Sequence, residues 1–283
     1  MRLVTVVFGL TACATGGPAA RGGDDQSGGT DSGVDAPGGH GHPDAAAPGV
    51  TAKLLLSEVA LAPGGHEFIE IVNPSATQTV DLSTYYLSDN GNYFKLPAGV
   101  PPAASADFIV KFPGGATITP HGVVTVALDT TANFSAAYGT TPTYSIGDGS
   151  MTTIVSQAPT LTDAGELIVL FQWDGASELV KDVDILLAGV PTAANGFVAK
   201  SGYAMGATSY HADADSMPMQ ASAAASGKST KRIALDTGHQ TAAGGGDGID
   251  GDDETSEMTT ATWDTTASYS APTPGQVPTA LLP

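Results

Sequence analysis

The sequence predicts an all-β fold, an antiparallel sandwich or barrel, from three features. Glycine and proline are abundant, with 36 and 19 among the 283 residues, which implies frequent turns and excludes a long helical bundle. Short apolar segments recur along the chain, and each is bounded by Gly, Pro, Asn or Asp. One short helix, at residues 133–138, is predicted in the first half of the chain. Regularly spaced short strands of this kind are typical of sandwiches and barrels.

The predicted strands begin where the composition changes, at Thr51. The first two strands are expected at residues 53–60 and 67–72, and a Pro-Gly-Gly turn at residues 63–65 joins them. Further strands are predicted at residues 84–88, 93–96, 108–112, 123–128, 166–173 and 180–187. Residues 51–283 are therefore expected to form the folded domain.

The first residues have the pattern of an export signal. Arg2 precedes an apolar run that is too short to cross a bilayer, which needs about 20 apolar residues. Leu10-Thr11-Ala12-Cys13 then resembles the lipobox of bacterial lipoproteins. The resemblance implies that a signal peptidase removes residues 1–12 and that Cys13, the single cysteine of the chain, carries lipid. Ala14 stands where an inner-membrane retention signal would have Asp, so we expect an exported outer-membrane lipoprotein that faces the periplasm or the cell surface.

Residues 13–50 form a predicted disordered linker between the lipid and the folded domain. They consist mostly of Gly, Ala, Asp, Pro, Ser and Thr and contain no Phe, Tyr or Trp, so they bury too little apolar surface to offset their ordering entropy. Within them, His40-Gly41-His42-Pro43-Asp44 is superficially similar to a motif of binuclear metallohydrolases. That motif needs a strand to fix its imidazole rings, and here Gly and Pro surround it.

The charge balance restricts the partners. There are 10 basic and 29 acidic residues, which gives a formal net charge of −19. Such a chain repels phosphate backbones and offers few cations to replace their counterions. No nucleic-acid partner is expected.

Several segments follow, in order, the pattern of one known family. They are Leu56-Ser57-Glu58-Val59, residues 67–74, Val80-Asp81-Leu82-Ser83, Leu87-Ser88-Asp89, residues 120–126 and 165–170, Arg232, Trp263 and Thr273-Pro274-Gly275. Over residues 51–276 the chain thus resembles the lamin tail domain, which occurs in nuclear lamins and in many bacterial envelope proteins. The resemblance implies an immunoglobulin-like antiparallel β-sandwich. It also implies structural roles at loop ends for Glu58, Glu70, Asn73, Asp81 and Asp89.

The chain departs from the family pattern in four places. The Asn that commonly follows the final Pro-Gly is absent. Thr84-Tyr85 replaces the usual Gly-Trp after the Asp-Leu-Ser motif, which changes the aromatic residue of the core. A long insertion rich in Ala, Gly and Ser is predicted near residues 188–231, and an acidic loop at residues 244–257. Because loops carry function on a rigid scaffold, these two segments are candidates for a function particular to this protein.

Two carboxylates are candidates for catalysis. Glu58 and Glu70 fall on strands that we expect to be neighbours, and glycoside hydrolysis requires a pair of carboxyl groups about 5 to 9 Å apart. The family resemblance favours the structural role instead. The segment Gly147-Asp148-Gly149-Ser150-Met151 has the wrong spacing for a nucleophile elbow, so no catalytic constellation is recognised.

Trp173 and Trp263 have two interpretations, as platforms for carbohydrate or as residues of the core. The histidines outside the linker, His66, His121, His211 and His239, are interpreted as loop or turn residues without triad partners.

The acidic loop suggests one metal. Six carboxylates crowd within it, at Asp247, Asp250, Asp252, Asp253, Glu254 and Glu257. Asp250, Asp252 and Glu254 match the first three ligand positions of a helix-loop-helix calcium site. The match ends there, because Thr255 stands where that site requires Gly and Ala261 where it requires a bidentate Glu. The two interpretations are therefore a weak calcium loop and a solvated acidic loop, and no other cofactor is expected.

These observations favour a lipid-anchored β-sandwich of the cell envelope that serves as a non-catalytic binding or structural module. Its expected partners are the membrane, through the lipid on Cys13, and an envelope protein or polysaccharide. The alternative is an envelope-associated hydrolase or an accessory domain of one.

Overall fold

The computed structural model describes residues 53–61, 66–156, 158–163, 165–189, 198, 200, 202–210, 227–235, 262–264 and 271–282. By its internal contacts the chain divides into Met1–Pro48 and Gly49–Pro283, and all described residues belong to the second unit. The predicted export signal, Cys13 and the predicted linker lie outside the described residues. Among the residues described, no helix has the length and apolar character to span a membrane.

The first of two large sheets contains five strands in the order β14-β1-β2-β7-β8. They are β1 (Leu55–Ala60), β2 (Phe68–Val72), β7 (Val123–Ala127), β8 (Tyr144–Ser145) and β14 (Thr230–Lys231). All neighbours are antiparallel except β7 and β8, which pair in parallel.

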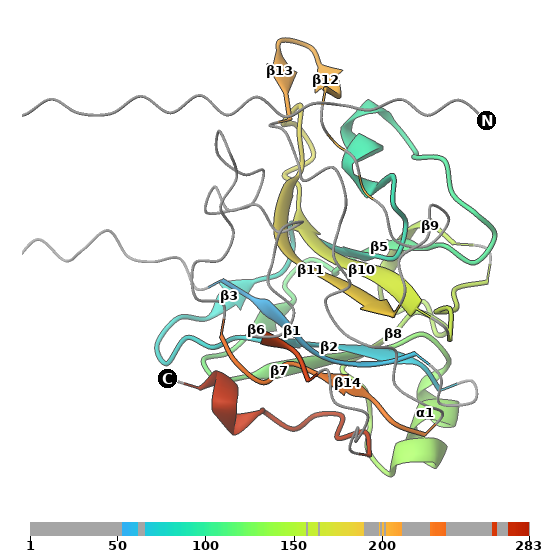
Figure 1. Cartoon of the computed structure of the whole chain (residues 1–283), viewed down its shortest axis with the longest axis vertical. Coiled ribbons are helices and arrows are strands. Elements are labelled where there is room, and N and C mark those ends of the chain that lie inside the picture. Colours follow the sequence, from blue (N-terminus) through green and yellow to red (C-terminus); the bar gives the residue numbers. More distant parts are fainter. Residues whose placement is uncertain are drawn as a thin grey trace, which may run out of the picture. The chain divides into compact units, whose positions relative to one another are not determined.

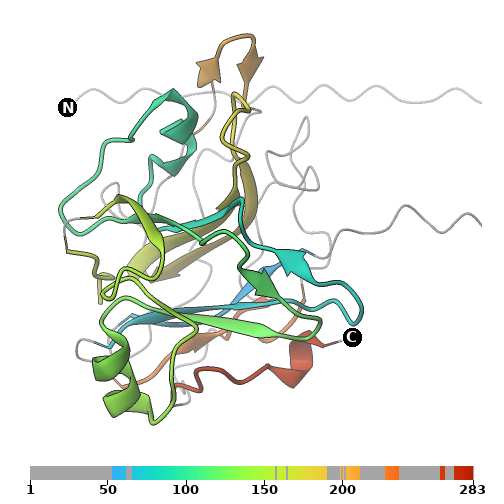
Figure 2. The same ribbon diagram turned by 180° about the vertical axis from the view of Figure 1, so that it is seen from behind.

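The second large sheet has the order β11-β10-β4-β5-β9 and is antiparallel throughout. Its strands are β4 (Tyr85–Ser88), β5 (Ile109–Lys111), β9 (Thr152–Val155), β10 (Gly165–Gln172) and β11 (Lys181–Gly189). Two small ribbons pair β3 (Val80–Asp81) with β6 (Thr117–Ile118) and β12 (Ala204–Met205) with β13 (Thr208–Ser209). The two large sheets face each other as layers (Figures 1 and 2), so the predicted immunoglobulin-like antiparallel β-sandwich is confirmed.

The core lies between the two layers. Strand residues that alternate inward, such as Leu56 and Ile69 from the first sheet and Leu87 and Ile168 from the second, form one apolar cluster that also contains Trp263. This is the packing expected of two amphipathic sheets. Tyr85, which replaces the usual Trp of the family pattern, is also buried in this cluster.

The outer face of the second sheet is also covered. Tyr86 and Phe171 point away from the central core and pack with Tyr93, Val198 and Tyr210 in a second apolar cluster. Because β10 is buried on both faces, its sequence is a continuous apolar run instead of an alternating one. Part of the predicted insertion, around Val198 and Tyr210, therefore packs on the sandwich.

The strand predicted at residues 93–96 is wrong, because this segment is the 3-10 helix η1 (Tyr93–Ala98). The Asn90 side chain accepts a hydrogen bond from the backbone N–H of Asn92, and the Asn90 carbonyl accepts one from Tyr93, so the chain turns here. Pro97 lacks the N–H that a central strand would need. The apolar residues of the segment are buried on the outer face of the second sheet.

The predicted short helix is confirmed as α1 (Thr131–Tyr138). The Thr130 hydroxyl caps its first turn by accepting a hydrogen bond from the N–H of Asn133, at 3.3 Å. Gly139 ends it with a φ of 69°, a conformation that favours glycine. Near the C-terminus, the 3-10 helix η3 (Thr279–Leu281) packs Leu281 against Leu55 and Val72.

Candidate functional site

The carboxylates considered for catalysis lie directly opposite each other, since Glu58 of β1 pairs with Glu70 of β2. Both side chains are buried. Glu58 accepts hydrogen bonds from the hydroxyl of Ser229 at 2.5 Å and from the N–H and hydroxyl of Thr273 at 2.8 and 2.7 Å. Lys231 Nζ lies 3.7 Å from Glu58 Oε1. Residues from the C-terminal part of the chain therefore surround this carboxylate.

Glu70 is held in the same way. It accepts hydrogen bonds from the Ser57 hydroxyl at 3.3 Å, the Thr125 hydroxyl at 3.0 Å and the backbone N–H of Gly275 at 2.6 Å. Burial, together with the charge of Glu58, raises the pKa of Glu70 to about 7. All four oxygens of this carboxylate pair thus accept hydrogen bonds from the protein itself, as a structural role requires.

An ion pair of Arg232 with Asp184 joins the two sheets at the same end of β1. Arg232 Nη2 lies 2.7 and 2.6 Å from the two carboxylate oxygens of Asp184, and both side chains are buried. The guanidinium also donates through Nε to the carbonyl of Leu56, at 2.7 Å, and lies 4.8 Å from the ring centre of Trp263. Arg232 and Trp263, which belong to the late part of the family pattern, are thus buried in the folded domain.

The other residues of the family pattern lie at loop ends. Asn73 donates to the carbonyls of Gln78 at 2.7 Å and Thr119 at 3.0 Å, which closes the loop after β2. Exposed Asp81 accepts from the N–H of Ser83 at 2.8 Å. Buried Asp89 accepts from the N–H of Phe108 at 2.6 Å, and burial raises its pKa to about 9.

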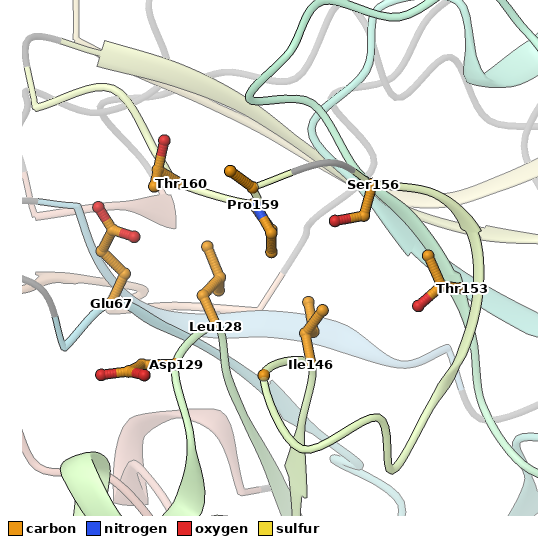
Figure 3. Close-up of a pocket in the computed structure, with 10 residues that line it drawn as sticks. Glu67, Leu128, Asp129, Ile146, Thr153, Ser156, Pro159 and Thr160 are labelled. Atoms are coloured by element: carbon orange, nitrogen blue, oxygen red, sulfur yellow. The ribbon is translucent and has the colours of Figure 1, made fainter.

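A pocket of about 450 Å³ opens between the two sheets at the edges formed by β8 and β9, and we call it the edge pocket (Figure 3). It is lined by Glu67, Leu128, Asp129, Ile146, Gly147, Thr153, Ser156, Ala158, Pro159 and Thr160. Leu128 and Ile146 point from the first sheet toward Pro159, and the hydroxyl of Ser156 points toward the middle of the pocket (Figure 3). The pocket therefore combines an apolar floor with hydroxyl and carboxyl groups, as ligand sites do.

Glu67 dominates the electrostatics of the edge pocket. Burial raises its pKa to about 7, and the charges of Asp163 and Glu166 add to the rise. A hydrogen bond from the backbone of Leu161 acts in the opposite direction. Near neutral pH, Glu67 therefore exchanges between a hydrogen-bond donor and an ionised acceptor.

Asp129 is the second carboxylate of the edge pocket, and it is held by the start of α1. It accepts hydrogen bonds from the N–H of Thr130 at 2.6 Å and from the Asn133 amide at 2.7 Å. Nδ1 of His66 lies 3.8 Å from the Asp129 carboxylate. His66 thus lies beside the acidic groups of this pocket, although the sequence offered it only a role in a loop.

A smaller pocket of about 200 Å³ lies at the tip of the β10–β11 hairpin, and we call it the hairpin pocket. Half-buried Trp173 lines it, next to Thr84, Gln172, Asp174, Ser177, Leu179 and Lys181. The two tryptophans therefore differ: Trp263 is a core residue, and Trp173 has one part packed on the sheet and another in a pocket.

Sequence reasoning missed the edge pocket, the hairpin pocket and the buried ion pairs, of which Arg232–Asp184 is described above. Lys200 forms an ion pair with Asp182, and the hydroxyl of Tyr93 donates to the same carboxylate at 2.7 Å. Lys200 also lies 5.5 Å from the ring centre of Tyr210. The sequence contained one indication of this ion pair, a lysine within a stretch rich in Ala and Gly. The ion pair connects the described part of the insertion at Lys200 to Asp182 of β11.

Some sequence predictions fall outside the described residues. These are Cys13, His40, His42, His211, His239 and the six acidic residues Asp247, Asp250, Asp252, Asp253, Glu254 and Glu257. Within the part of the chain that the structure describes, no group of three or more His, Cys, Asp or Glu side chains is arranged to hold a metal ion.

Comparison with known proteins agrees with the fold. Residues 47–184 match the family model of the Lamin Tail Domain, a segment that runs from before β1 into β11. No curated protein matches the chain. The late residues Arg232, Thr273 and Gly275 lie beyond the match, yet they contact its buried carboxylates. The match confirms the resemblance inferred from the sequence as far as residue 184 and identifies residues 47–184 as a lamin tail domain.

Proposed function

We propose that this protein is a lipid-anchored module of the cell envelope or cell surface that binds an envelope component without catalysing a reaction on it. The lamin tail domain is a non-enzymatic immunoglobulin-like domain, which supports a binding or structural role. The burial of Glu58 and Glu70 supports it too, because both carboxylates are engaged by donors of the protein itself.

The observation that carries the binding role is the edge pocket. Its floor is apolar, at Leu128 and Ile146, and its rim offers Glu67, Ser156 and Thr160 for hydrogen bonds (Figure 3). A partner with several hydroxyl or N–H donors complements this rim. An envelope polysaccharide and an exposed segment of an envelope protein are the two partners that supply such groups.

The anchoring is supported by the sequence alone. Cys13 follows a short apolar run in a lipobox, and residues 14–50 are long enough to hold a domain clear of the lipid headgroups. We propose an outer-membrane lipoprotein on this basis, with no nucleic-acid partner because the net charge is −19.

Filling the edge pocket tests the binding role. The lipid on Cys13 would itself hold the chain on membranes, so the proteins compared are residues 14–283, which lack the signal segment and the cysteine. We expect Ser156→Phe to place a ring in the pocket and to reduce retention on sedimented envelopes about tenfold relative to the same segment with the wild-type pocket, a change of about 1.4 kcal/mol in binding free energy. Thr152→Phe is the matched control, because it adds the same ring to the exposed edge strand β9 at a position outside the pocket lining. Treating the envelopes with protease or with polysaccharide-degrading enzymes then separates the two partner classes.

Equal retention of the wild type and Ser156→Phe would overturn the role of the edge pocket. The comparison requires that both variants unfold at the temperature of the wild type. Absence of retention for all three proteins would overturn binding to the envelope itself.

One observation favours the alternative, an envelope-associated hydrolase. Glu67 has a pKa of about 7 and lies in the same pocket as Asp129, and a carboxyl group with that pKa is suited to general acid–base catalysis at neutral pH. Release of new reducing ends from envelope polysaccharide by the wild type, and its loss in Glu67→Gln, would support the hydrolase. We expect no release from either protein.

A further inference from the structure

The side chain of Trp173 is placed unlike that of the other tryptophan of the chain. The chain has two tryptophans, and Trp263 is completely buried. Trp173 follows directly after β10 and is only half-buried, with its ring tilted at 46° to that of Tyr86 and a centroid distance of 6.3 Å. Tryptophan has a large apolar face and a single N–H donor, so it suits a surface that contacts an amphipathic ligand.

Hydrogen bonds hold the indole of Trp173 in one orientation. Its ring N–H donates to the carbonyl of Ser177 at 2.9 Å, and its backbone N–H donates to the carbonyl of Thr84, also at 2.9 Å. The first bond connects the ring to the β10–β11 hairpin, and the second connects the backbone of Trp173 to the residue that precedes β4. The ring is therefore fixed before any ligand arrives, which lowers the entropy cost of binding.

Polar groups beside the ring are fixed as well. The Gln172 amide donates to the Thr84 hydroxyl at 3.0 Å. Asp174 accepts from the N–H groups of Ala176 and Ser177 at 2.8 and 2.7 Å, and from the Ser177 hydroxyl at 2.6 Å. A few oriented polar groups around an apolar surface are the usual composition of a small-molecule site.

The charge of the hairpin pocket indicates the class of ligand. Hydrogen bonds from Ser177 lower the pKa of Asp174 to about 2, so this carboxylate is ionised, and Lys181 contributes an ammonium group to the same pocket. One charge of each sign favours a neutral ligand with hydroxyl groups over a phosphate or a polyamine. An aromatic face beside such groups matches a pyranose ring, which has an apolar C–H face and hydroxyl groups at its edge.

We propose that the hairpin pocket is a saccharide subsite in which a neutral pyranose unit stacks on Trp173 and bonds through its hydroxyl groups to Gln172, Asp174 and Lys181. The inference rests on the proposed binding to an envelope component and names a polysaccharide as that component. It assigns the contact to a pocket separate from the edge pocket. A single ring has few atoms, so the Kd of the subsite is expected near 1 mM.

The tryptophan fluorescence of the full chain tests the proposal directly, because Trp263 is buried and Trp173 lines the hairpin pocket. The probes are cellotetraose and chitotetraose as neutral saccharides, spermidine as a cation and inorganic phosphate as an anion. We expect at least one neutral saccharide to change the emission saturably and to reduce acrylamide quenching about twofold, with a Kd near 1 mM. Spermidine and phosphate should leave both unchanged.

Two substitutions connect the signal to the ring. In a calorimetric titration we expect Trp173→Tyr, which keeps an aromatic face, to bind the same saccharide within about fivefold of the wild type, and Trp173→Leu to lose measurable binding. Both variants must unfold within a few degrees of the wild type, and the fluorescence of the unmodified chain serves as the test that needs no substitution.

The proposal is overturned if neither saccharide changes the emission at about 10 mM, or if Trp173→Leu binds as the wild type does. It is also overturned if spermidine or phosphate, and no saccharide, produces the signal. The outcome is distinguishable from failure of the proposed function, because Ser156→Phe in the edge pocket should leave the Trp173 response intact whatever happens to envelope retention.

Discussion

At the scale of single residues, Arg232 and Asp184 form a buried ion pair with several further partners. Arg232 donates to both oxygens of Asp184, and the same carboxylate accepts from the N–H of Leu56 at 2.6 Å. Asp184 belongs to β11 and Leu56 to β1, so this network joins strands of different sheets. Removal of one partner leaves a buried charge without compensation, which is far more costly than loss of an exposed ion pair.

We therefore predict that Arg232→Met lowers the free energy of unfolding by about 3 to 5 kcal/mol, as measured by urea denaturation. Lys228→Met is the control, because Lys228 is exposed and the same change there should cost less than about 0.5 kcal/mol. Adding Asp184→Leu to Arg232→Met should recover part of the loss. A loss under about 1 kcal/mol in Arg232→Met would contradict the structural role of the pair.

The buried carboxyl group of Glu70 predicts a pH dependence. Its pKa is about 7 in the folded protein and 4.5 as a model value for the unfolded chain. Between these values the unfolded chain gives up the proton first, so the contribution of Glu70 is fully present below pH 4.5 and is lost as the pH rises toward 7. Ionisation of a buried group therefore disfavours the folded state at neutral pH.

Glu70→Gln should remove this dependence, because the amide cannot ionise and retains an oxygen that accepts from Gly275. The difference in unfolding free energy between the variant and the wild type should change in favour of the variant by roughly 3 kcal/mol between pH 4.5 and 7. Urea denaturation across this range measures it. Parallel curves for the two proteins would show that Glu70 titrates normally.

At the scale of elements, the C-terminal segment 271–282 completes the sandwich from outside the matched family segment. Thr273 and Gly275 donate to the carboxylates of β1 and β2, and Leu281 of η3 packs against Leu55 and Val72. The short strand β14 pairs with the other edge of β1. The late part of the chain thus covers the edge that β1 would otherwise expose, and it supplies donors to the buried carboxylates of β1 and β2.

Thr273→Val tests this segment with a small change of shape. The hydroxyl of Thr273 donates to Glu58 at 2.7 Å and accepts from Lys231 at 2.7 Å, so we predict a loss of about 1 to 3 kcal/mol in unfolding free energy. Thr279→Val makes the same change at an exposed position of the same segment and should be nearly neutral. Equal effects of the two substitutions would show that the contact with Glu58 carries no stability.

The long strands were predictable because their sequences have clear boundaries. Residues 67–72 and 123–128 were predicted within one residue of β2 and β7 at each end. The two-residue strands β3, β6, β8 and β14 are too short for a pattern, and their positions are decided by distant partners. The strand prediction at residues 93–96 was wrong for another reason. A run of four mostly apolar residues is too short to show a periodicity, so it does not distinguish a strand from a helical turn packed on a sheet.

The candidate sites were less predictable than the strands. Glu58 and Glu70 lie on two strands joined by a short connection, so the sequence predicted that these strands are neighbours. The donors Thr273 and Gly275 are 215 and 205 residues away from the carboxylates that they contact, and no local pattern reports such a contact. The edge pocket likewise joins Glu67 with Ser156 and Thr160, which only the packing of the two sheets brings together.

The acidic loop at residues 244–257 keeps its two interpretations. A weak calcium site predicts heat and a thermal shift at millimolar calcium, the affinity of extracellular modules. The double variant Asp250→Asn, Asp252→Asn should then lose both signals and keep the fold, because it removes ligands and mutual repulsion together. Calorimetric titration without heat would support the solvated loop.

At the scale of the whole molecule, the net charge restricts the partners. The net charge of −19 predicts that the protein fails to retain double-stranded DNA even at low salt, where attraction would be strongest. An electrophoretic mobility shift at about 50 mM salt measures this, and micromolar binding there would contradict the charge argument. We propose that the lamin tail domain, held on a long linker, contacts other envelope components through surfaces such as the edge pocket and the hairpin pocket.

The central claim is that the protein acts while attached to the envelope through Cys13. Metabolic labelling with a palmitate analogue, in a bacterial host that processes lipoproteins, tests it most directly. The account predicts that the wild type is labelled and sediments with membranes, whereas Cys13→Ser is unlabelled and keeps its apolar signal segment. A wild type that carries no label, or a Cys13→Ser variant labelled to the same extent, would contradict it.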